Sequence, residues 1–211
     1  MQSSKFPIII VVLLALVLGI LSANLGLLRG DASEKAVVSL ETATVLNPPR
    51  AVPEFSLLDH KGQEFTKASL QGKHSILFFG FINCPDICPG TLQFLKSVKK
   101  NLVEAQQWEN FQVVFVSVDP ARDTVENMSQ YVPYFDQEFI GVTGTIESID
   151  AFSKSLYMPY SIGEKDENGF YNVDHSASLL VSNEQGDIKA IISQPQALDA
   201  LSADLLTIVS P

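Results

Sequence analysis

The chain has 211 residues, enough for one well-packed domain with a tail and too few for two domains of ordinary size. Its formal net charge is −10 at pH 7, and residues 29–211 hold 24 acidic against 13 basic side chains. This acidic balance disfavours nucleic acid and anionic membrane surfaces, so we expect no nucleic-acid partner.

Residues 6–28 form an apolar run without a charged side chain, about as long as a helix that crosses a bilayer. A cleaved signal peptide is the alternative, but its apolar region usually spans about 7–15 residues and ends at a small-x-small site. The candidate site here, Leu21-Ser22-Ala23, begins with a large residue. We therefore expect residues 1–28 to stay attached as one transmembrane helix, and Lys5 before the run favours a cytoplasmic amino terminus.

This orientation places the rest of the chain outside the cytoplasm, in a compartment that permits disulfides. Because no Arg-rich and Ser-rich transit segment precedes the run, we expect a bacterial inner membrane with the soluble domain in the periplasm. The alternative is a mitochondrial inner membrane, with the domain facing the intermembrane space. Residues 29–48 are polar and lead into a proline pair, which favours an extended tether before a folded domain at residues 49–211.

Short apolar runs then alternate with helical periodicity along the chain. The expected strands cover residues 55–58, 63–66, 75–81, 111–118, 139–142, 160–162, 170–173, 178–181 and 188–192. The expected helices cover residues 91–105, 149–156 and 196–208, together with one that Asp123 or Thr124 caps and that ends near Tyr131. This order predicts an α/β fold with a central mixed sheet flanked by helices.

The two cysteines both lie in the stretch FFGFINCPDICPGTL, residues 78–92. A structural disulfide gains most by closing a long loop, and two thiolates alone do not complete a zinc site. Cys84 and Cys88 are therefore a redox couple, half of a metal site, or both. Pro89 suits the first position of a helix, which predicts Cys88 at the N-cap, where the helix dipole favours a thiolate, and Cys84 in the preceding loop.

Two thiolates are soft ligands, and a small number of soft ligands favours Cu(I). The three histidines are the candidates for a third ligand. We expect His60, in a hairpin turn, and His74, at a strand edge beside a lysine, to be surface residues. His175 lies between two apolar strands, in a loop that another part of the fold could hold, although a lone histidine there is more often structural than ligating.

These motifs together resemble the Sco/SenC family, thioredoxin-like copper proteins that serve cytochrome c oxidase assembly. The signatures, in order, are GF at 80–81, CPDICP at 84–89 followed by TL at 91–92, VDPARDT at 118–124 and VDHSA at 173–177, preceded by PRAVPEF at 49–55. The resemblance implies a thioredoxin-like fold. It also implies a trigonal copper site with Cys84, Cys88 and His175 as metal ligands, one copper per chain, bound as Cu(I) or as Cu(II).

The implied function is that of a membrane-anchored copper chaperone. Such a protein delivers copper to the binuclear copper site of cytochrome c oxidase subunit II, or prepares the thiols of that site, and needs a thiol reductant of thioredoxin type as a second partner. The alternatives are a thiol–disulfide oxidoreductase, or a redox or copper sensor, that uses a Cys84–Cys88 disulfide when oxidised. Three residues between the cysteines count against general oxidoreductase work, so a metallochaperone is favoured over an enzyme.

Several other residues in these motifs have open roles. Asp119 and Asp123 either contribute charge near the metal loop or form caps and turns. Asp86 lies between the cysteines and either tunes them or meets a partner. Asp174 either orients His175 or faces water. Met158 is a soft thioether that we expect to belong to the core.

Overall fold

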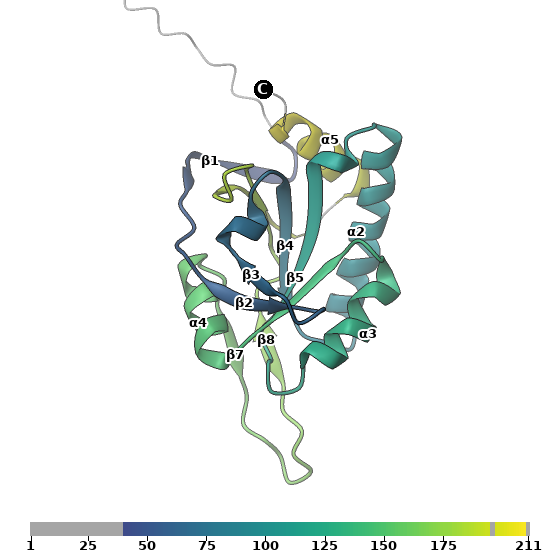
Figure 1. Cartoon of the computed structure of the whole chain (residues 1–211). Helices are drawn as coiled ribbons and strands as arrows, with labels where there is room; N and C mark the ends of the chain where they lie inside the picture. The colour runs from purple at the N-terminus through teal and green to yellow at the C-terminus, as the bar shows by residue number, and fades with distance from the viewer. Residues whose placement is uncertain (1–39, 195–196, 210–211) are drawn as a thin grey trace, which may run out of the picture. The chain divides into compact units, whose positions relative to one another are not determined.

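The computed structural model describes residues 40–194 and 197–209 (Figure 1). The predicted anchor at residues 1–28 and most of the predicted tether therefore lie outside the described residues. Within the two described ranges, no helix combines the length and the apolar character needed to cross a bilayer.

An eight-stranded mixed sheet forms the centre of this part of the chain, in the order β1-β10-β9-β4-β5-β6-β2-β3. A separate two-stranded sheet pairs β7 with β8. The strands are β1 Ala43–Arg50, β2 Ser56–Asp59, β3 Glu64–Thr66, β4 His74–Gly80, β5 Phe111–Ser117, β6 Ile140–Thr143, β7 Tyr160–Ile162, β8 Val173–His175, β9 Leu179–Ser182 and β10 Ile188–Ile192. Strands β4, β5 and β6 run parallel, and the other pairs are antiparallel.

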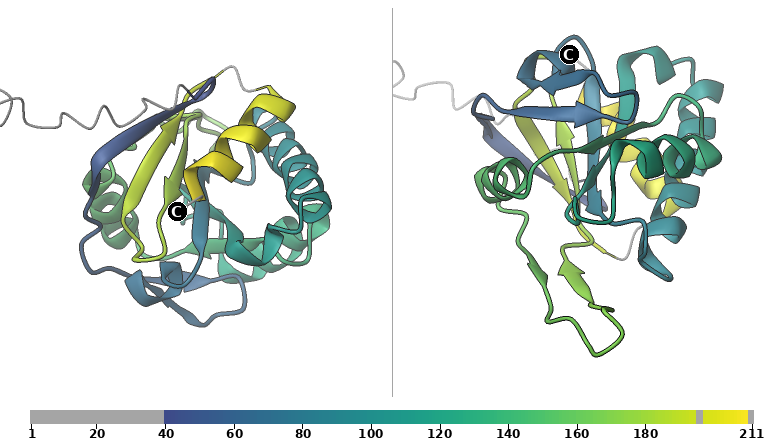
Figure 2. Two further views of the ribbon diagram at one scale, coloured as in Figure 1. Left: turned by 90° about the horizontal axis from the view of Figure 1, so that it is seen from above. Right: turned by 60° about the horizontal axis from the view of Figure 1, so that its bottom comes forward.

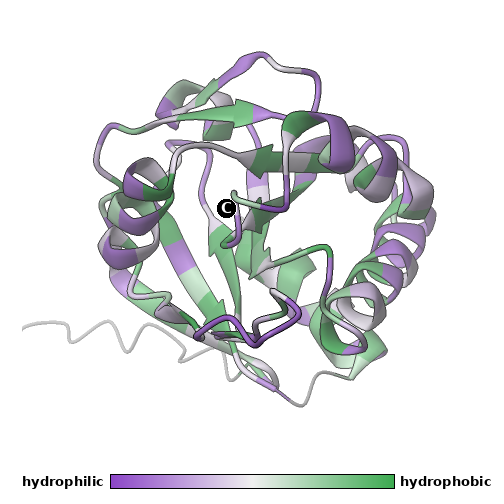
Figure 3. Cartoon of the chain, turned by 90° about the horizontal axis from the view of Figure 1, so that it is seen from below, coloured by the Kyte–Doolittle hydropathy of each residue, from purple (hydrophilic) through white to green (hydrophobic). Residues whose placement is uncertain are grey.

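Helices cover both faces of the sheet, with α2, α3 and α5 on one side and α4 on the other (Figure 2). The α-helices are α2 Ile87–Glu104, α3 Val125–Phe135, α4 Ile146–Ser155 and α5 Leu198–Val209, and short 3-10 helices cover Lys67–Leu70 and Trp108–Asn110. The buried residues of the helices are mainly hydrophobic, and hydrophobic colour predominates along the central strands (Figure 3). The expected mixed α/β architecture is confirmed.

Strand β4 lies at the middle of the core, with every residue buried. This matches its continuous apolar sequence, which is typical of a strand covered on both faces. It pairs in parallel with β5 from His74 opposite Phe111 to Gly80 opposite Ser117. It pairs antiparallel with β9, where Phe78 lies opposite Leu179. The chain therefore leaves β4, leaves β5 and enters β9 at the same end of the sheet.

Several local predictions hold. The two expected hairpins form as β2–β3 and β9–β10. Helix α3 begins after Thr124, whose side chain accepts a hydrogen bond from the backbone N–H of Asn127 at 3.2 Å. Of the two capping candidates, Asp123 and Thr124, the structure therefore selects Thr124. The helix continues past the expected end near Tyr131 to Phe135.

The prediction of a tether at residues 29–48 is wrong at the carboxyl end of that range, because residues 43–48 belong to β1. Ala43 lies opposite Ile192 of β10, and Val45 lies opposite Ala190. β1 is an edge strand, where a proline without an N–H can be accommodated, so the proline pair does not exclude a strand. The start of β1 is held by α5. The carboxylate of Asp204 accepts hydrogen bonds from the Thr42 N–H (2.6 Å), the Thr42 hydroxyl (2.7 Å) and the Ala43 N–H (3.1 Å).

The predicted surface positions of two histidines are also wrong. His60 is 7% exposed and His74 is 6% exposed. Each ring is buried because it satisfies a backbone group of a distant strand. His60 Nδ1 accepts from the Gly141 N–H at 3.1 Å, and His74 Nδ1 donates to the Ser182 carbonyl at 3.0 Å. Burial lowers the pKa of both imidazoles, which favours their neutral forms.

Replacing Asp204 with asparagine should lower the free energy of unfolding by about 1.5–3 kcal/mol at neutral pH, because a buried carboxylate loses its charge-assisted hydrogen bonds. Burial by itself raises the pKa of Asp204, but the hydrogen bonds from Thr42, Glu41 and Ala43 outweigh it and leave the pKa below its usual value. The wild-type advantage should therefore be complete above the unfolded pKa of about 3.9 and disappear as the pH falls through the lower folded pKa.

Urea unfolding of the two proteins across this pH range measures the effect. The control is Asp199→Asn, an exposed carboxylate in the first turn of the same helix, which should cost less than about 1 kcal/mol. Equal losses from both variants would mean that Asp204 does not hold the start of β1.

Candidate metal centre

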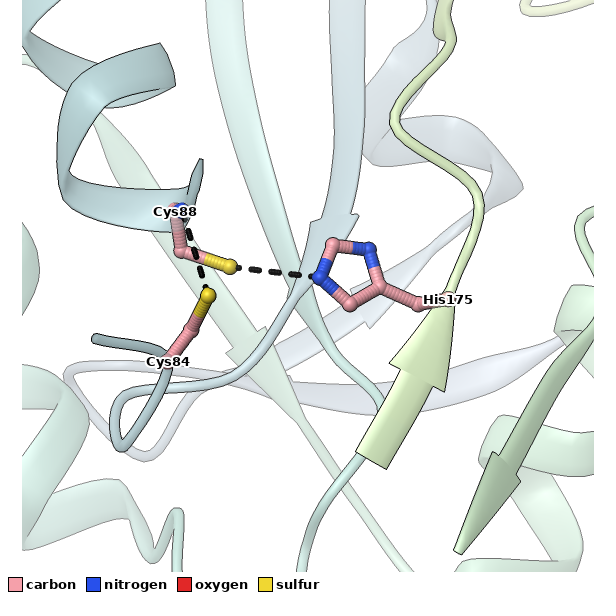
Figure 4. A group of neighbouring side chains, drawn as sticks. All are labelled: Cys84, Cys88 and His175. Atoms are coloured by element: carbon pink, nitrogen blue, oxygen red, sulfur yellow. Dashed lines mark hydrogen bonds between the residues drawn. The ribbon is translucent and has the colours of Figure 1, made fainter. Parts of the chain in front are cut away.

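Cys84, Cys88 and His175 meet at the end of the sheet where the chain leaves β4 (Figure 4). Their candidate donor atoms, two Sγ atoms and an imidazole nitrogen, all lie within 4.8 Å of one another. The distance from Cys88 Sγ to His175 Nε2 is 3.5 Å. The structure therefore brings together the three residues that the sequence selected, although His175 is 87 positions from Cys88.

The sequence predicted Cys88 at the N-cap of α2, but Cys88 lies inside the first turn of that helix. The helix begins at Ile87 with Asp86 as the N-cap residue, and its first helical hydrogen bond runs from the Gly90 N–H to the Asp86 carbonyl at 3.0 Å. The first N–H groups of a helix have no partner within it, so Pro89 is tolerated there. One of these free groups, the N–H of Cys88, donates to Cys84 Sγ at 3.4 Å and holds the two cysteines together.

Gly80 provides the space that the Cys88 sulfur occupies. A Cβ atom on Gly80 would lie 2.6 Å from Cys88 Sγ and 2.8 Å from the ring of Phe115, closer than real Cβ contacts come. Cys88 is accordingly buried at the end of β4, while Cys84 is half-buried and reaches the surface. Sequence patterns assign Gly80 no role beyond its place in a motif, because the contact depends on how α2 packs.

The predicted thiolate character of Cys88 does not hold for the metal-free protein. Burial raises the pKa of its thiol well above the usual value, and the nearby Cys84 and Asp123 raise it further. A buried sulfur with few polar neighbours stays protonated because a bare negative charge is costly there. A bound metal cation would supply the opposite charge and displace the proton.

His175, at the end of β8, presents a free nitrogen lone pair to the cysteines. Its Nδ1 lies 3.0 Å from the carbonyl oxygen of Ser176. A carbonyl only accepts hydrogen bonds, so in the neutral imidazole Nδ1 carries the proton and the lone pair lies on Nε2, the atom facing Cys88. The ring packs edge-on against Phe78 and Phe81, with centroid distances of 6.0 and 5.7 Å. This tautomer and this fixed orientation are those required of a metal ligand.

The two aspartates of the VDPARDT motif are fully buried and are not part of the donor group. Asp123 accepts hydrogen bonds from the Ser117 hydroxyl at 2.7 Å and from the Ile82 N–H at 3.0 Å. Burial raises the pKa of Asp123 to about 6, although these two hydrogen bonds oppose the increase. Asp119 pairs with Arg122. Of the two roles considered from the sequence, these contacts favour a structural one beneath the metal loop.

Three candidate residues remain: Asp86 and Asp174 are exposed, and Met158 is buried. Asp86 is exposed at the start of α2, and its side chain makes no capping hydrogen bond. Asp174 is exposed, while the Ser176 carbonyl contacts the imidazole of His175, which favours the water-facing alternative for Asp174. Met158 is buried in the core, as expected.

Chemically, the centre offers two thiols and one imidazole. Among the described residues this group has three members, whereas a structural zinc site usually has four protein ligands. Soft ligands in low number favour Cu(I) over hard oxygen-seeking cations, so the donors fit copper. Both cysteines are free thiols placed close together, so the same atoms also fit a dithiol–disulfide couple.

Known proteins are similar to this chain in sequence and fold. The SCO1/SenC family model matches residues 44–210. The mitochondrial SCO2 homologue of Mus musculus is 42% identical over 133 residues, which are 63% of this chain and 52% of that protein, so the chain spans about half of that relative.

Two solved structures are also similar. Arabidopsis thaliana ScoI with copper bound has a TM-score of 0.70 and 32% identity, and the match covers 75% of this chain and 98% of that one. The apo Sco1 protein of Thermus thermophilus has a TM-score of 0.72 and 34% identity, with 82% and 99% covered.

Replacing Gly80 with alanine should destabilise the domain by about 1–3 kcal/mol, because the added methyl group overpacks the space that the Cys88 sulfur fills. Urea unfolding of the metal-free protein measures this. Gly90→Ala is the matched control: its Cβ would meet nothing within 4 Å, and alanine favours a helix, so that variant should be neutral or up to about 1 kcal/mol more stable. Equal stability of the Gly80→Ala variant and the wild type would contradict the packing described here.

Proposed function

Because the chain belongs to the SCO1/SenC family, we propose that it is a copper-binding assembly factor of cytochrome c oxidase, with one copper ion held by Cys84, Cys88 and His175. The observation that carries this proposal is the meeting of two thiols and one imidazole, whose Nδ1 is held by the Ser176 carbonyl, within 4.8 Å. The copper-bound ScoI of Arabidopsis thaliana, which has the same fold, supports the choice of metal.

Copper is the cargo in this proposal, and each ligand has a distinct task. Binding displaces a proton from each thiol, so the two sulfurs meet the ion as thiolates. Cys88 and His175 hold the inner side of the ion, since the Cys88 sulfur is buried and the imidazole is packed between two phenylalanine rings. Cys84 is half-buried, so it is the ligand that the thiols of an acceptor protein reach first.

The proposed acceptor is the binuclear copper site of oxidase subunit II. A thiol reductant of thioredoxin type would return the cysteines to the dithiol form. Residues 1–28 would tether the domain to the bacterial inner membrane on its periplasmic side, or to the mitochondrial inner membrane in the alternative. These assignments rest on family membership and on the apolar amino-terminal run.

A second candidate, thiol–disulfide exchange with a partner protein, is favoured by the two free and adjacent thiols. His175 is the residue that distinguishes copper binding from thiol–disulfide exchange. Dithiol chemistry has no evident need of an unprotonated Nε2 3.5 Å from Cys88 Sγ, whereas a copper site uses that atom as its third ligand.

The full-length reduced protein should bind one Cu(I) ion, and its X-ray absorption spectrum should show two sulfur ligands and one nitrogen ligand. His175→Ala should weaken Cu(I) binding by roughly tenfold or more, as expected when a ligand is lost from an otherwise intact site. Affinity is measured by competition with a Cu(I) chelator under anaerobic conditions. Asp174→Asn, at the exposed neighbouring residue, is the control and should bind as the wild type does. Identical spectra for wild type and His175→Ala would remove the histidine from the site.

Copper loading and disulfide formation should exclude one another, because copper binds the two sulfur atoms as thiolates, and oxidation joins those same two atoms in an S–S bond and leaves no thiolate. A dipyridyl disulfide oxidises the two thiols by two electrons, and the resulting protein should take up no Cu(I) at this centre. Conversely, bound Cu(I) should protect both cysteines from alkylation, which mass spectrometry counts. Tight Cu(I) binding by the fully oxidised protein would contradict the assignment of Cys84 and Cys88 as ligands.

A further inference from the structure

The VDPARDT segment, residues 118–124, lies next to the cysteine loop but supplies no metal ligand. It follows β5, and its first residue hydrogen-bonds to the end of β4, from the Val118 N–H to the Gly80 carbonyl at 2.8 Å. The cysteine loop begins at that same point of β4. Copper binding by the three ligands does not by itself explain why this segment has three charged side chains, two of them fully buried.

One end of the segment holds the cysteine loop. The carboxylate of Asp123 accepts a hydrogen bond from the N–H of Ile82, two residues before Cys84, at 3.0 Å. The Thr143 hydroxyl donates to the Asp123 carbonyl at 2.8 Å and ties the same residue to β6. The loop that carries the two sulfurs is thereby fixed to the body of the sheet.

Arg122 contacts the chain on the histidine side of the centre, just before β8 begins. Its guanidinium carbon lies 3.8 Å from the centroid of the Tyr171 ring, and its Nη1 donates to the Tyr171 carbonyl at 3.3 Å. The Tyr171 hydroxyl donates to Asp119 at 2.8 Å, and Asp119 forms an ion pair with Arg122 Nε. Tyr171 is 6% exposed and lies four residues before His175, so this cluster anchors the strand that ends in the histidine.

Arg122 also faces the ring against which the histidine packs. Its guanidinium carbon lies 5.7 Å from the centroid of Phe81, on the side of the centre that the cysteine loop forms. The Phe81 ring meets the imidazole of His175 at an interplanar angle of 85°. Arg122 therefore lies against Tyr171, four residues before His175, and against Phe81, one of the two rings that pack on the imidazole.

The histidine needs such an anchor because β7 and β8 form a hairpin outside the main sheet, with residues 161–170 all exposed (Figure 1). A two-stranded hairpin by itself is only marginally stable in water. The place of His175 opposite the cysteines therefore depends on contacts at the base of the hairpin.

We propose that Arg122 is a positioning residue of the copper centre: through Tyr171 and Phe81 it holds His175 at the cysteines and so sets the affinity and the nitrogen ligation of the site. This inference rests on the proposed function, because its consequence is read in copper binding. It assigns the VDPARDT segment the task of joining the cysteine half of the centre to the histidine half.

The test is a double-mutant cycle between Arg122→Lys and His175→Ala, read by anaerobic Cu(I) competition on the full chain. Lysine keeps the positive charge next to Asp119 but lacks the planar group that stacks on Tyr171. Arg122→Lys should weaken Cu(I) binding by roughly tenfold and reduce the nitrogen contribution to the X-ray absorption spectrum. In the His175→Ala background the same change should have no further effect, since a positioning residue acts only through the ligand it positions.

Lys165→Gln is the matched control. It removes the other cation that faces the Tyr171 ring, at 5.6 Å from the centroid, and it lies in the exposed part of the hairpin. This variant should bind Cu(I) as the wild type does. A loss equal to that of Arg122→Lys would show that any cation near Tyr171 has the same influence, and would overturn the assignment to Arg122.

The remaining outcomes separate this inference from the proposed function. If His175→Ala leaves copper binding unchanged, both fail. If His175→Ala weakens binding but Arg122→Lys has no effect, or weakens binding equally in both backgrounds, the inference fails and the proposed function stands. If Arg122→Lys does not fold, as judged by circular dichroism, Tyr171→Leu replaces it in the cycle, and a loss that persists without the histidine overturns the inference.

Discussion

The directions of three neighbouring strands decide where the candidate metal centre forms. β4 and β5 are parallel, so their carboxyl ends lie side by side, and β9 is antiparallel to β4, so its amino end lies at the same edge. The cysteine loop, residues 118–124 and the residues that follow His175 therefore all meet at one end of the sheet. This arrangement needs the long, fully buried β4 at its centre, because both neighbouring strands pair with it.

The centre is prepared for a metal ion by its protonation states. The Ser176 carbonyl selects the neutral tautomer of His175 with its proton on Nδ1 and its lone pair on Nε2. The apolar surroundings of Cys88 keep its thiol neutral in the absence of a cation. The Cys88 sulfur thus gains its negative charge only together with a cation that balances it.

The same geometry explains why copper binding and thiol chemistry are hard to separate in this chain. Both use the sulfur atoms that the first turn of α2 brings together, and both need one sulfur near the surface. The histidine is the feature that distinguishes them, and its position depends on a hairpin outside the main sheet. The buried Asp119 and the half-buried Arg122, together with Tyr171, connect that hairpin to the core.

The sequence by itself determined the strands and helices whose patterns are local: the continuous apolar runs of β4 and β5, the two hairpins and the cap of α3. The spacing of Cys84 and Cys88 also marked them as a redox pair or part of a metal site, and the resemblance to the Sco/SenC family added His175 as the expected third ligand. The tertiary structure alone decided the burial of His60 and His74, whose partners lie 81 and 108 positions away, and the pairing of β1 with β10. It likewise decided the contact of Arg122 with Tyr171, 49 positions apart, because only the packed fold brings such distant residues together.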